Sequence, residues 1–162
     1  MKKRIIALGL LWCLSAVMLQ AARVDTVLVR SAAMNKDVKV VYVLPDKAIG
    51  KQACPVVYLL HGYGGNARSW VQLKPELPQM ADEKGIIFVC PDGKNSWYWD
   101  SPENPAYRYE TFVTSELVKY TDGNYATIPD RKARAISGLS MGGTVLCGVL
   151  SAIRMCSVRR AV

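Results

Sequence analysis

A serine flanked by glycines is the feature of this 162-residue chain most able to do chemistry. The segment Gly138-Leu139-Ser140-Met141-Gly142 has the pattern G-x-S-x-G and directly follows an apolar run, residues 133–136. In such a segment a strand ends, the chain turns sharply into a helix, and the serine hydroxyl is held up at the turn. Gly138, Gly142 and Gly143 fit that turn because they have no Cβ to clash. We therefore predict Ser140 as a catalytic nucleophile, in preference to a solvated serine in a small-residue turn.

A second glycine-rich segment, His61-Gly62-Tyr63-Gly64-Gly65, follows the apolar run 55–60. A run of that kind is typical of a strand buried on both faces of a parallel sheet. The loop can offer one backbone donor to an oxyanion and the residue after the serine another, so the N–H groups of Tyr63 and Met141 are the predicted donors. We predict that His61, Gly62, Gly64 and Gly65 position this loop. His61 is the only histidine of the chain and precedes Ser140, so we interpret it as structural and not as the catalytic base.

The remaining segments indicate the elements that must hold these two loops. Strands are expected at 24–30, 38–44, 85–90 and 133–136, and a helical stretch at 67–84 is expected to break at Pro75 and Pro78. A further helix at 107–120 should end in the turn residues 122–124, with Glu116 solvated more readily than holding a loop. Alternation of strands and helices predicts an α/β fold, a mostly parallel sheet with helices on both faces.

The segment with the most unusual composition is residues 95–109, NSWYWDSPENPAYRY, which has five aromatic residues and two prolines. Two interpretations remain open. The aromatic side chains could stack on a sugar ring or a phenolic acyl group near the mouth of the site. Alternatively, they could pack a long loop against itself.

Three stretches together carry a family resemblance: LLHGYGGNARSW (59–70), IIFVCPDG (86–93) and the segment from YETFVTSEL to ISGLSMGG (109–143). They resemble the α/β-hydrolase superfamily and, within it, the esterase family that includes esterase D (S-formylglutathione hydrolase), tributyrin, feruloyl and acetylxylan esterases, and the mycolyltransferases. The resemblance covers about residues 24–143. It implies a carboxylic-ester hydrolase that forms an acyl-enzyme on Ser140 and needs no cofactor. It leaves open the ester substrate, and also acyl transfer in place of hydrolysis.

The N-terminus predicts export. Met1-Lys2-Lys3-Arg4 is basic, residues 5–19 are apolar, and Gln20-Ala21-Ala22 provides small residues for cleavage. Residues 1–22 therefore read as a secretory signal, too short for a stable membrane span, and the mature protein is expected to be secreted or periplasmic. Export favours an acylated glycan or a short-chain lipid ester as substrate over S-formylglutathione, because glutathione chemistry belongs to the cytosol.

Composition excludes two other classes of site. The net charge of +8 is concentrated at the ends: seven of the 21 lysines and arginines lie outside residues 24–143, whereas all 13 carboxylates lie inside, so no nucleic-acid partner is predicted. Of five cysteines, Cys54 and Cys90 are expected at opposite ends of neighbouring parallel strands, too far apart to form a disulfide. No C-x-x-C or His/Cys cluster suggests a metal.

The chain has no Asp, Glu or His after Ser140, although an α/β hydrolase supplies its acid and its histidine in that order after the serine. We therefore expect an incomplete α/β-hydrolase domain at 23–143, inactive by itself, and a frameshifted tail at 144–162. If one nucleotide is added before the Thr144 codon, permissible synonymous codons give the sequence HGALWRAIRHPDVFGAAGS. This sequence is similar to the one that follows the serine motif in the family. The alternative to a frameshift is a naturally truncated gene. The alternative function is that of a non-catalytic fragment or a carbohydrate-binding pseudoenzyme.

Overall fold

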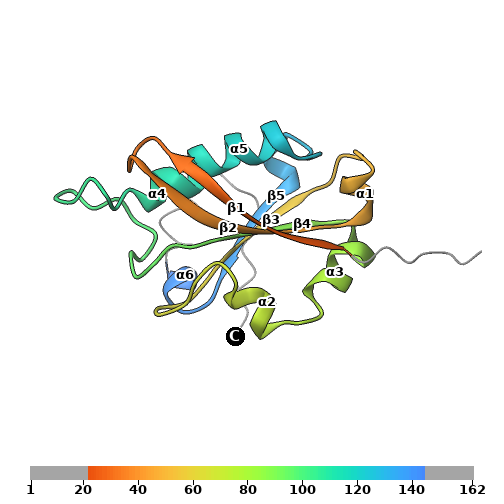
Figure 1. Ribbon diagram of the computed structural model, residues 1–162, viewed down its shortest axis with the longest axis horizontal. Helices are drawn as coiled ribbons and strands as arrows, with labels where there is room; N and C mark the ends of the chain where they lie inside the picture. Colours follow the sequence, from red (N-terminus) through yellow and green to blue (C-terminus); the bar gives the residue numbers. More distant parts are fainter. Residues whose placement is uncertain (1–21, 145–162) are drawn as a thin grey trace, which may run out of the picture.

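A computed structural model describes residues 22–144 (Figure 1). It contains a five-stranded sheet in the order β1-β2-β4-β3-β5. The predicted secretory signal and the predicted frameshifted tail, apart from Ala22 and Thr144, lie outside the described residues. Among the described residues, every helix is too short or too polar to cross a bilayer.

The first two strands form a hairpin at one edge of this sheet. β1 (Arg23–Ser31) pairs antiparallel with β2 (Lys36–Leu44), and the turn between them has Asn35 at φ 50°, a left-handed conformation that asparagine tolerates. The Glu116 carboxylate accepts hydrogen bonds from Ser31 Oγ (2.6 Å) and Ala33 N (2.8 Å). Glu116 was expected to be solvated, and this expectation is wrong. The Glu116 carboxylate therefore joins the β1–β2 hairpin to the helical segment that contains Glu116.

The other three strands run parallel to one another and place the two glycine-rich loops. β3 (Val56–Leu60) lies between β4 (Ile87–Pro91) and β5 (Arg134–Gly138), and pairs in parallel with both. β2 joins the sheet antiparallel to β4, so the described sheet is mixed, with parallel pairing among β3, β4 and β5. The carboxyl ends of β3 and β5 meet at one edge of the sheet, where ligands bind in open α/β sheets.

Helices cover both faces of the sheet, as the α/β expectation requires (Figure 1). One face carries α4 (Tyr109–Thr111), the π-helical turn η1 (Phe112–Glu116) and α5 (Leu117–Asn124). The other carries α2 (Ser69–Leu73) and α3 (Leu77–Lys84). Short pieces complete the chain: α1 (Asp46–Ile49), the 3₁₀ turn η2 (Arg131–Ala133) and α6 (Met141–Thr144).

Two helix boundaries differ from expectation. Pro75 lies in the break between α2 and α3, but Pro78 lies in the first turn of α3, where its missing N–H has no intrahelical partner to lose. The helix expected to end at residues 122–124 includes all three, because Asn124 Nδ2 bonds back to the Tyr120 carbonyl (2.8 Å) and the Tyr125 amide to that of Thr121 (3.0 Å).

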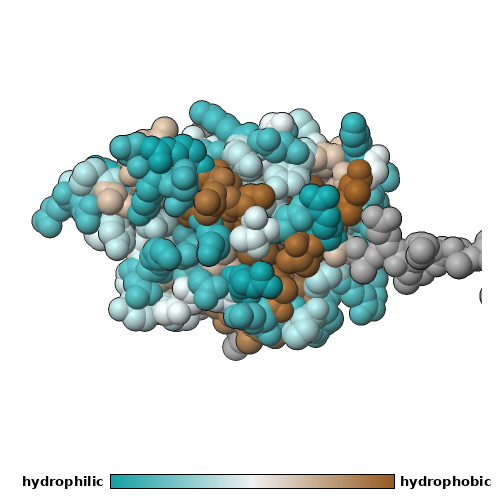
Figure 2. Space-filling view, viewed as in Figure 1, coloured by the Kyte–Doolittle hydropathy of each residue, from teal (hydrophilic) through white to brown (hydrophobic). Residues whose placement is uncertain are grey.

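Two apolar clusters fill the space between sheet and helices. Phe112, Val113 and Leu117 pack on one face of the sheet, and Leu77 and Ala81 pack on the other. Cys54 and Cys90 are both buried and unbridged, as expected. Figure 2 shows hydrophobic side chains at the surface over the β1–β2 hairpin, bordered by hydrophilic ones.

Candidate active site

Ser140 occupies a strained turn between β5 and α6. Its φ of 48° lies in the left-handed region, which costs a non-glycine residue on the order of 1–3 kcal/mol and persists only where the surroundings enforce it. Three local backbone hydrogen bonds enforce the Ser140 conformation. Gly142 N donates to Leu139 O (2.9 Å), and Gly143 N (2.8 Å) and Thr144 N (2.9 Å) both donate to Ser140 O. The chain therefore passes from strand to helix in two residues, with Ser140 at the turn.

The glycines on either side of Ser140 are required by close backbone contacts. A Cβ on Gly138 would lie 2.4 Å from the Gly142 carbonyl carbon. A Cβ on Gly142 would lie 2.7 Å from Leu60, at the end of β3. At Gly143 the nearest contact would be 3.1 Å, from the Gly138 carbonyl oxygen, so this position is tight but not closed. The turn is thus packed against itself and against the neighbouring strand.

The loop after β3 lies against this turn. A Cβ on Gly62 would be 3.4 Å from the Leu139 carbonyl oxygen and 3.6 Å from Ser140 Cβ. The next residue, Tyr63, has an exposed ring, and its amide has no acceptor among residues 22–144. The Met141 amide likewise has none within that range, while its side chain is fully buried. Two unengaged N–H groups therefore flank Ser140, one from each loop.

Two further glycines of the loop differ in what they require. Gly64 has φ 77°, and its amide donates to Asn95 Oδ1 at 2.8 Å. A Cβ on Gly65 would lie 2.9 Å from both His61 Nδ1 and Ser69 Oγ. Gly64 is therefore required for its backbone conformation, and Gly65 is required because a side chain would have no room there.

His61 is buried, and both of its ring nitrogens are engaged. Nδ1 lies 2.7 Å from the Gly62 carbonyl oxygen, and Nε2 lies 2.9 Å from the Gly93 amide. One neutral tautomer satisfies both contacts: Nδ1–H donates to the carbonyl, and Nε2 accepts from the amide. Neither nitrogen is left to take a proton from Ser140. The ring instead ties the loop after β3 to the loop after β4.

Asp92 stands beside this histidine but is held by a different partner. Its Oδ1 is 3.7 Å from His61 Nε2, beyond hydrogen-bond range, and the Nε2 lone pair already accepts from Gly93. Burial raises the pKa of Asp92, but the neighbouring His61 ring, together with the Lys94 amide (3.0 Å) and ammonium (2.9 Å), lowers it by more. The pKa of this carboxyl therefore lies well below its usual range, and Asp92 is ionised at neutral pH.

The aromatic segment 95–109 is partly a packed anchor and partly an exposed surface. Tyr98 is buried, and its hydroxyl accepts the His61 amide hydrogen at 3.0 Å. Trp97 and Trp99 are about half exposed, at 48% and 55%. The Trp97 ring lies 6.5 Å from that of Tyr63, centroid to centroid. The self-packing interpretation is therefore confirmed for Tyr98, whereas stacking on a sugar or phenolic ring stays a prediction for Trp97 and Trp99.

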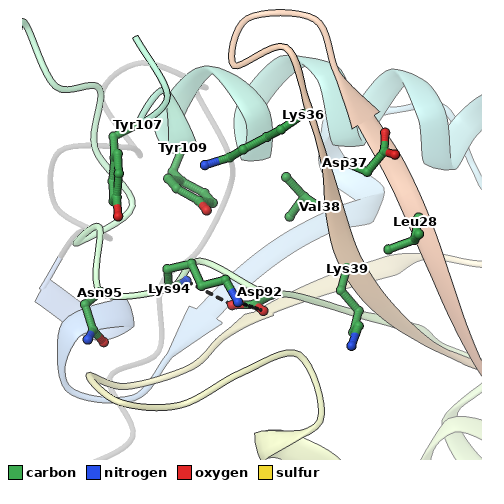
Figure 3. A pocket seen from close by; sticks show the side chains of 10 residues that line it. All are labelled: Leu28, Lys36, Asp37, Val38, Lys39, Asp92, Lys94, Asn95, Tyr107 and Tyr109. Carbon is green, nitrogen blue, oxygen red and sulfur yellow. Dashed lines mark hydrogen bonds and ion pairs between the residues drawn. The ribbon is translucent and has the colours of Figure 1, made fainter. Parts of the chain in front are cut away.

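A groove opens beside this segment, beyond the carboxyl end of β4 (Figure 3). Its volume is about 560 Å³. Its lining comes from the hairpin on one side and from the loop after β4 on the other: Leu28, Lys36, Asp37, Val38 and Lys39, and Asp92, Lys94, Asn95, Tyr107 and Tyr109. Its two walls are more than fifty residues apart in the chain, so local sequence patterns do not predict this groove.

The described residues do not complete a catalytic triad. Ser140 Oγ has no hydrogen-bond partner within residues 22–144, and the chain's single histidine is engaged elsewhere. Over the same range, no group of three metal-ligating side chains comes together. The structure thus brings Ser140, Gly62, Tyr63 and Met141 together, with no base beside them.

Sequence reasoning missed three contributors to this site. Asn95 fixes Gly64, Tyr98 caps the His61 amide, and Glu116 holds the hairpin. Each acts across a sequence separation of 31 to 85 residues. Only their polar or aromatic character within apolar surroundings could have singled them out.

Comparisons with known proteins agree with this geometry. The Esterase family, described as "Putative esterase", matches residues 31–152. An acetyl esterase of Caldicellulosiruptor saccharolyticus is 28% identical over 121 residues, which cover 70% of this chain and 45% of that protein. Among solved structures, an S-formylglutathione hydrolase from Agrobacterium tumefaciens has a TM-score of 0.70 at 26% identity, covering 80% of this chain and 53% of the other.

A ferulic acid esterase structure also has a TM-score of 0.70, at 27% identity, covering 83% of this chain and 57% of the other. The chain spans about half the length of these relatives. The family match covers most of the chain, and the strand order, the strained serine and the glycine loop occur together in the described residues. The chain belongs to the Esterase family of α/β hydrolases.

Proposed function

We propose that this protein is a serine carboxylesterase in which Ser140 is the nucleophile. The observation that carries the proposal is the left-handed Ser140, held against the Gly62–Tyr63 loop beside two amides that have no acceptor within residues 22–144. Backbone strain at a non-glycine residue, held by local backbone hydrogen bonds between two glycines that have no room for a Cβ, clusters at functional positions.

The reaction follows from the placement of these groups. Ser140 Oγ attacks the ester carbonyl carbon, and the carbonyl oxygen becomes an oxyanion. The amides of Tyr63 and Met141 donate to that oxyanion, a contribution worth about 3–4 kcal/mol per donor in comparable sites. Collapse of the tetrahedral intermediate expels the alcohol, leaving an acyl group on Ser140, and water then releases the acid.

A base must take the Ser140 proton and return it to the leaving alcohol. His61 cannot serve, because its lone-pair nitrogen accepts from Gly93. We propose that the catalytic base and the acid that orients it come from a longer form of the protein, in which one nucleotide is restored before the Thr144 codon. We call this form the extended protein. Loss of the histidine from a serine hydrolase costs roughly a million-fold in turnover, so the chain as printed should be inactive.

Export and the aromatic surface suggest the substrate class. The sequence of residues 1–22 supports a secreted or periplasmic protein. An acylated glycan or a short-chain lipid ester is accessible there, and the exposed Trp97 and Trp99 rings offer flat surfaces of the kind that stack on sugars.

The experiment is an assay of short-chain p-nitrophenyl esters with the extended protein and with the printed chain. We expect turnover from the first and none above background from the second. Sequencing the locus past the Gly143 codon should reveal an offset open frame that encodes a later Asp and His. Turnover by the printed chain, or the absence of such a frame, would overturn the proposed source of the base.

A second candidate is a carbohydrate-binding protein without catalysis, favoured by the absence of a base near Ser140 among the described residues. It predicts glycan binding with no esterase activity in either form. Acyl transfer instead of hydrolysis is a third, and it predicts turnover that rises when an alcohol acceptor is added.

A further inference from the structure

The groove beyond β4 carries positive charge that the described part of the chain does not neutralise. Lys36 and Lys39 have no carboxylate within 4.0 Å among residues 22–144. The two carboxylates of the lining are already committed: Asp92 to Lys94, and Asp37 to Arg30 at 3.6 Å. The surplus therefore lies with the two lysines of β2.

Lys36 is the more constrained of these two lysines. Its Nζ lies 5.0 Å from the centroid of the Tyr107 ring and 4.7 Å from that of Tyr109, and it donates to the Ala106 carbonyl oxygen (Figure 3). Burial lowers the pKa of Lys36 and the nearby Lys94 charge lowers it further, whereas the Asp92 charge raises it by less. All of its direct partners are neutral, so an anionic group in the groove would relieve the cost of holding this charge partly desolvated.

The groove adjoins the candidate active site through two hydrogen bonds. Asn95 lines the groove, and its Oδ1 accepts from Gly64, the residue after Tyr63. Asp92 lines it too and precedes Gly93, whose amide donates to His61. A ligand in the groove therefore contacts the residues that hold the oxyanion loop, at the edge of the sheet where Ser140 lies.

The lining favours a sugar that bears a carboxylate over a small inorganic anion. The volume of about 560 Å³ falls within the roughly 300–1,000 Å³ typical of small-molecule sites and far exceeds what one phosphate fills. Asn95 and the Tyr107 hydroxyl can bond to sugar hydroxyls, and the partly exposed Tyr107 ring offers apolar contact. The Asp92 charge would repel a free dianion but can accept from a hydroxyl group.

We propose that this groove binds a uronic acid unit of an acylated glycan, with Lys36 facing its carboxylate. This proposal rests on the proposed function, because the bound sugar is the alcohol part of the ester that Ser140 attacks. The groove thereby selects acidic glycans and holds them beside the oxyanion loop.

Binding tests the proposal independently of catalysis. Calorimetry with the printed chain should detect methyl β-glucuronide, and methyl β-glucoside should bind roughly tenfold more weakly because it lacks the charge. Ser140→Ala protein should bind the glucuronide equally, so failure of the esterase assignment leaves this result unchanged. Inorganic phosphate should displace the glucuronide only at concentrations well above the Kd of the glucuronide.

Matched variants locate the site. Lys36→Gln should weaken glucuronide binding roughly three- to tenfold, with glucoside binding unchanged. Lys39 is exposed on β2, so Lys39→Gln should fold normally, and it should weaken binding less because its side chain leaves the strand on the face opposite that of Lys36. Lys84→Gln is the control, since Lys84 is an exposed lysine at the end of α3, before the opposite end of β4. Equal binding of the two glycosides, full affinity in folded Lys36→Gln protein, or equal displacement by phosphate would overturn the proposal.

Discussion

Gly142 lies directly against Leu60: a Cβ on Gly142 would come within 2.7 Å of both the Cβ and the carbonyl oxygen of Leu60. This contact joins the turn after β5 to the end of β3, and so joins Ser140 to the loop that carries Tyr63. The spacing between nucleophile and oxyanion loop is therefore set by backbone packing more than by side-chain contacts.

Replacement of Gly142 should disrupt both stability and the site. Gly142→Ala forces backbone atoms apart, and overpacking of this kind costs typically about 1–3 kcal/mol. Urea unfolding of the printed chain measures the loss. Gly123→Ala is the control, because a Cβ there meets nothing within 4 Å and alanine should favour α5 by about 0.5–1 kcal/mol. Equal stability of the two variants would contradict the close contact at Gly142.

Tyr98 should stabilise the fold through one hydroxyl. Tyr98→Phe keeps the buried ring but leaves the His61 amide hydrogen without its acceptor, a loss of about 1–3 kcal/mol. Tyr107→Phe removes a hydroxyl from a ring that is 38% exposed, and should change stability little. Thermal unfolding of the two variants checks the difference, and a Tyr98→Phe protein as stable as the parent would show that another group satisfies the amide.

Alkaline pH should destabilise the fold through Cys90. Burial raises the pKa of this thiol from 9.0 to about 12, so the unfolded chain loses its proton at lower pH than the folded protein. The contribution of Cys90 is fully present below pH 9 and falls as the pH rises toward about 12. In Cys90→Ala the unfolding free energy should fall less steeply over this window. Buried tyrosines add their own slope, so identical slopes in parent and variant would exclude Cys90 as a contributor.

Export is tested by the N-terminus of the mature protein. Residues 1–22 have the charge and hydropathy of a cleaved signal, so protein recovered outside the cytoplasm should begin within a few residues of Arg23. Edman sequencing or terminal-peptide mass spectrometry reads this directly. Intact Met1 in the soluble exported fraction would argue against cleavage.

The strands and the two loops could be predicted because their signals are local. An apolar run ending in glycines marks β3 and its loop, and the same pattern marks β5 and Ser140. The contacts that fix these loops could not be predicted, because they join distant segments. Asn95 reaches Gly64, and Glu116 reaches Ser31 across 85 residues. Glu116 was misread as solvated because helical periodicity identifies the outer side of a helix, but not a hairpin that covers it.

The groove likewise could not be predicted, because distant segments form its two walls. Lys36 and Tyr107 line one wall each, and each alone looks like an ordinary surface residue. The antiparallel attachment of β2 to β4 brings them together, with the first residues of β2 extending beyond the end of β4. Local sequence patterns do not specify that register.

Covalent capture of Ser140 tests the central claim most directly. The extended protein is treated with a fluorophosphonate, digested, and analysed by mass spectrometry, with Ser140→Ala protein and heat-unfolded protein as controls. We predict one stoichiometric adduct on the peptide that contains Ser140, and none in either control. An adduct on another residue, or no adduct in a folded protein that hydrolyses esters, would contradict Ser140 as the nucleophile.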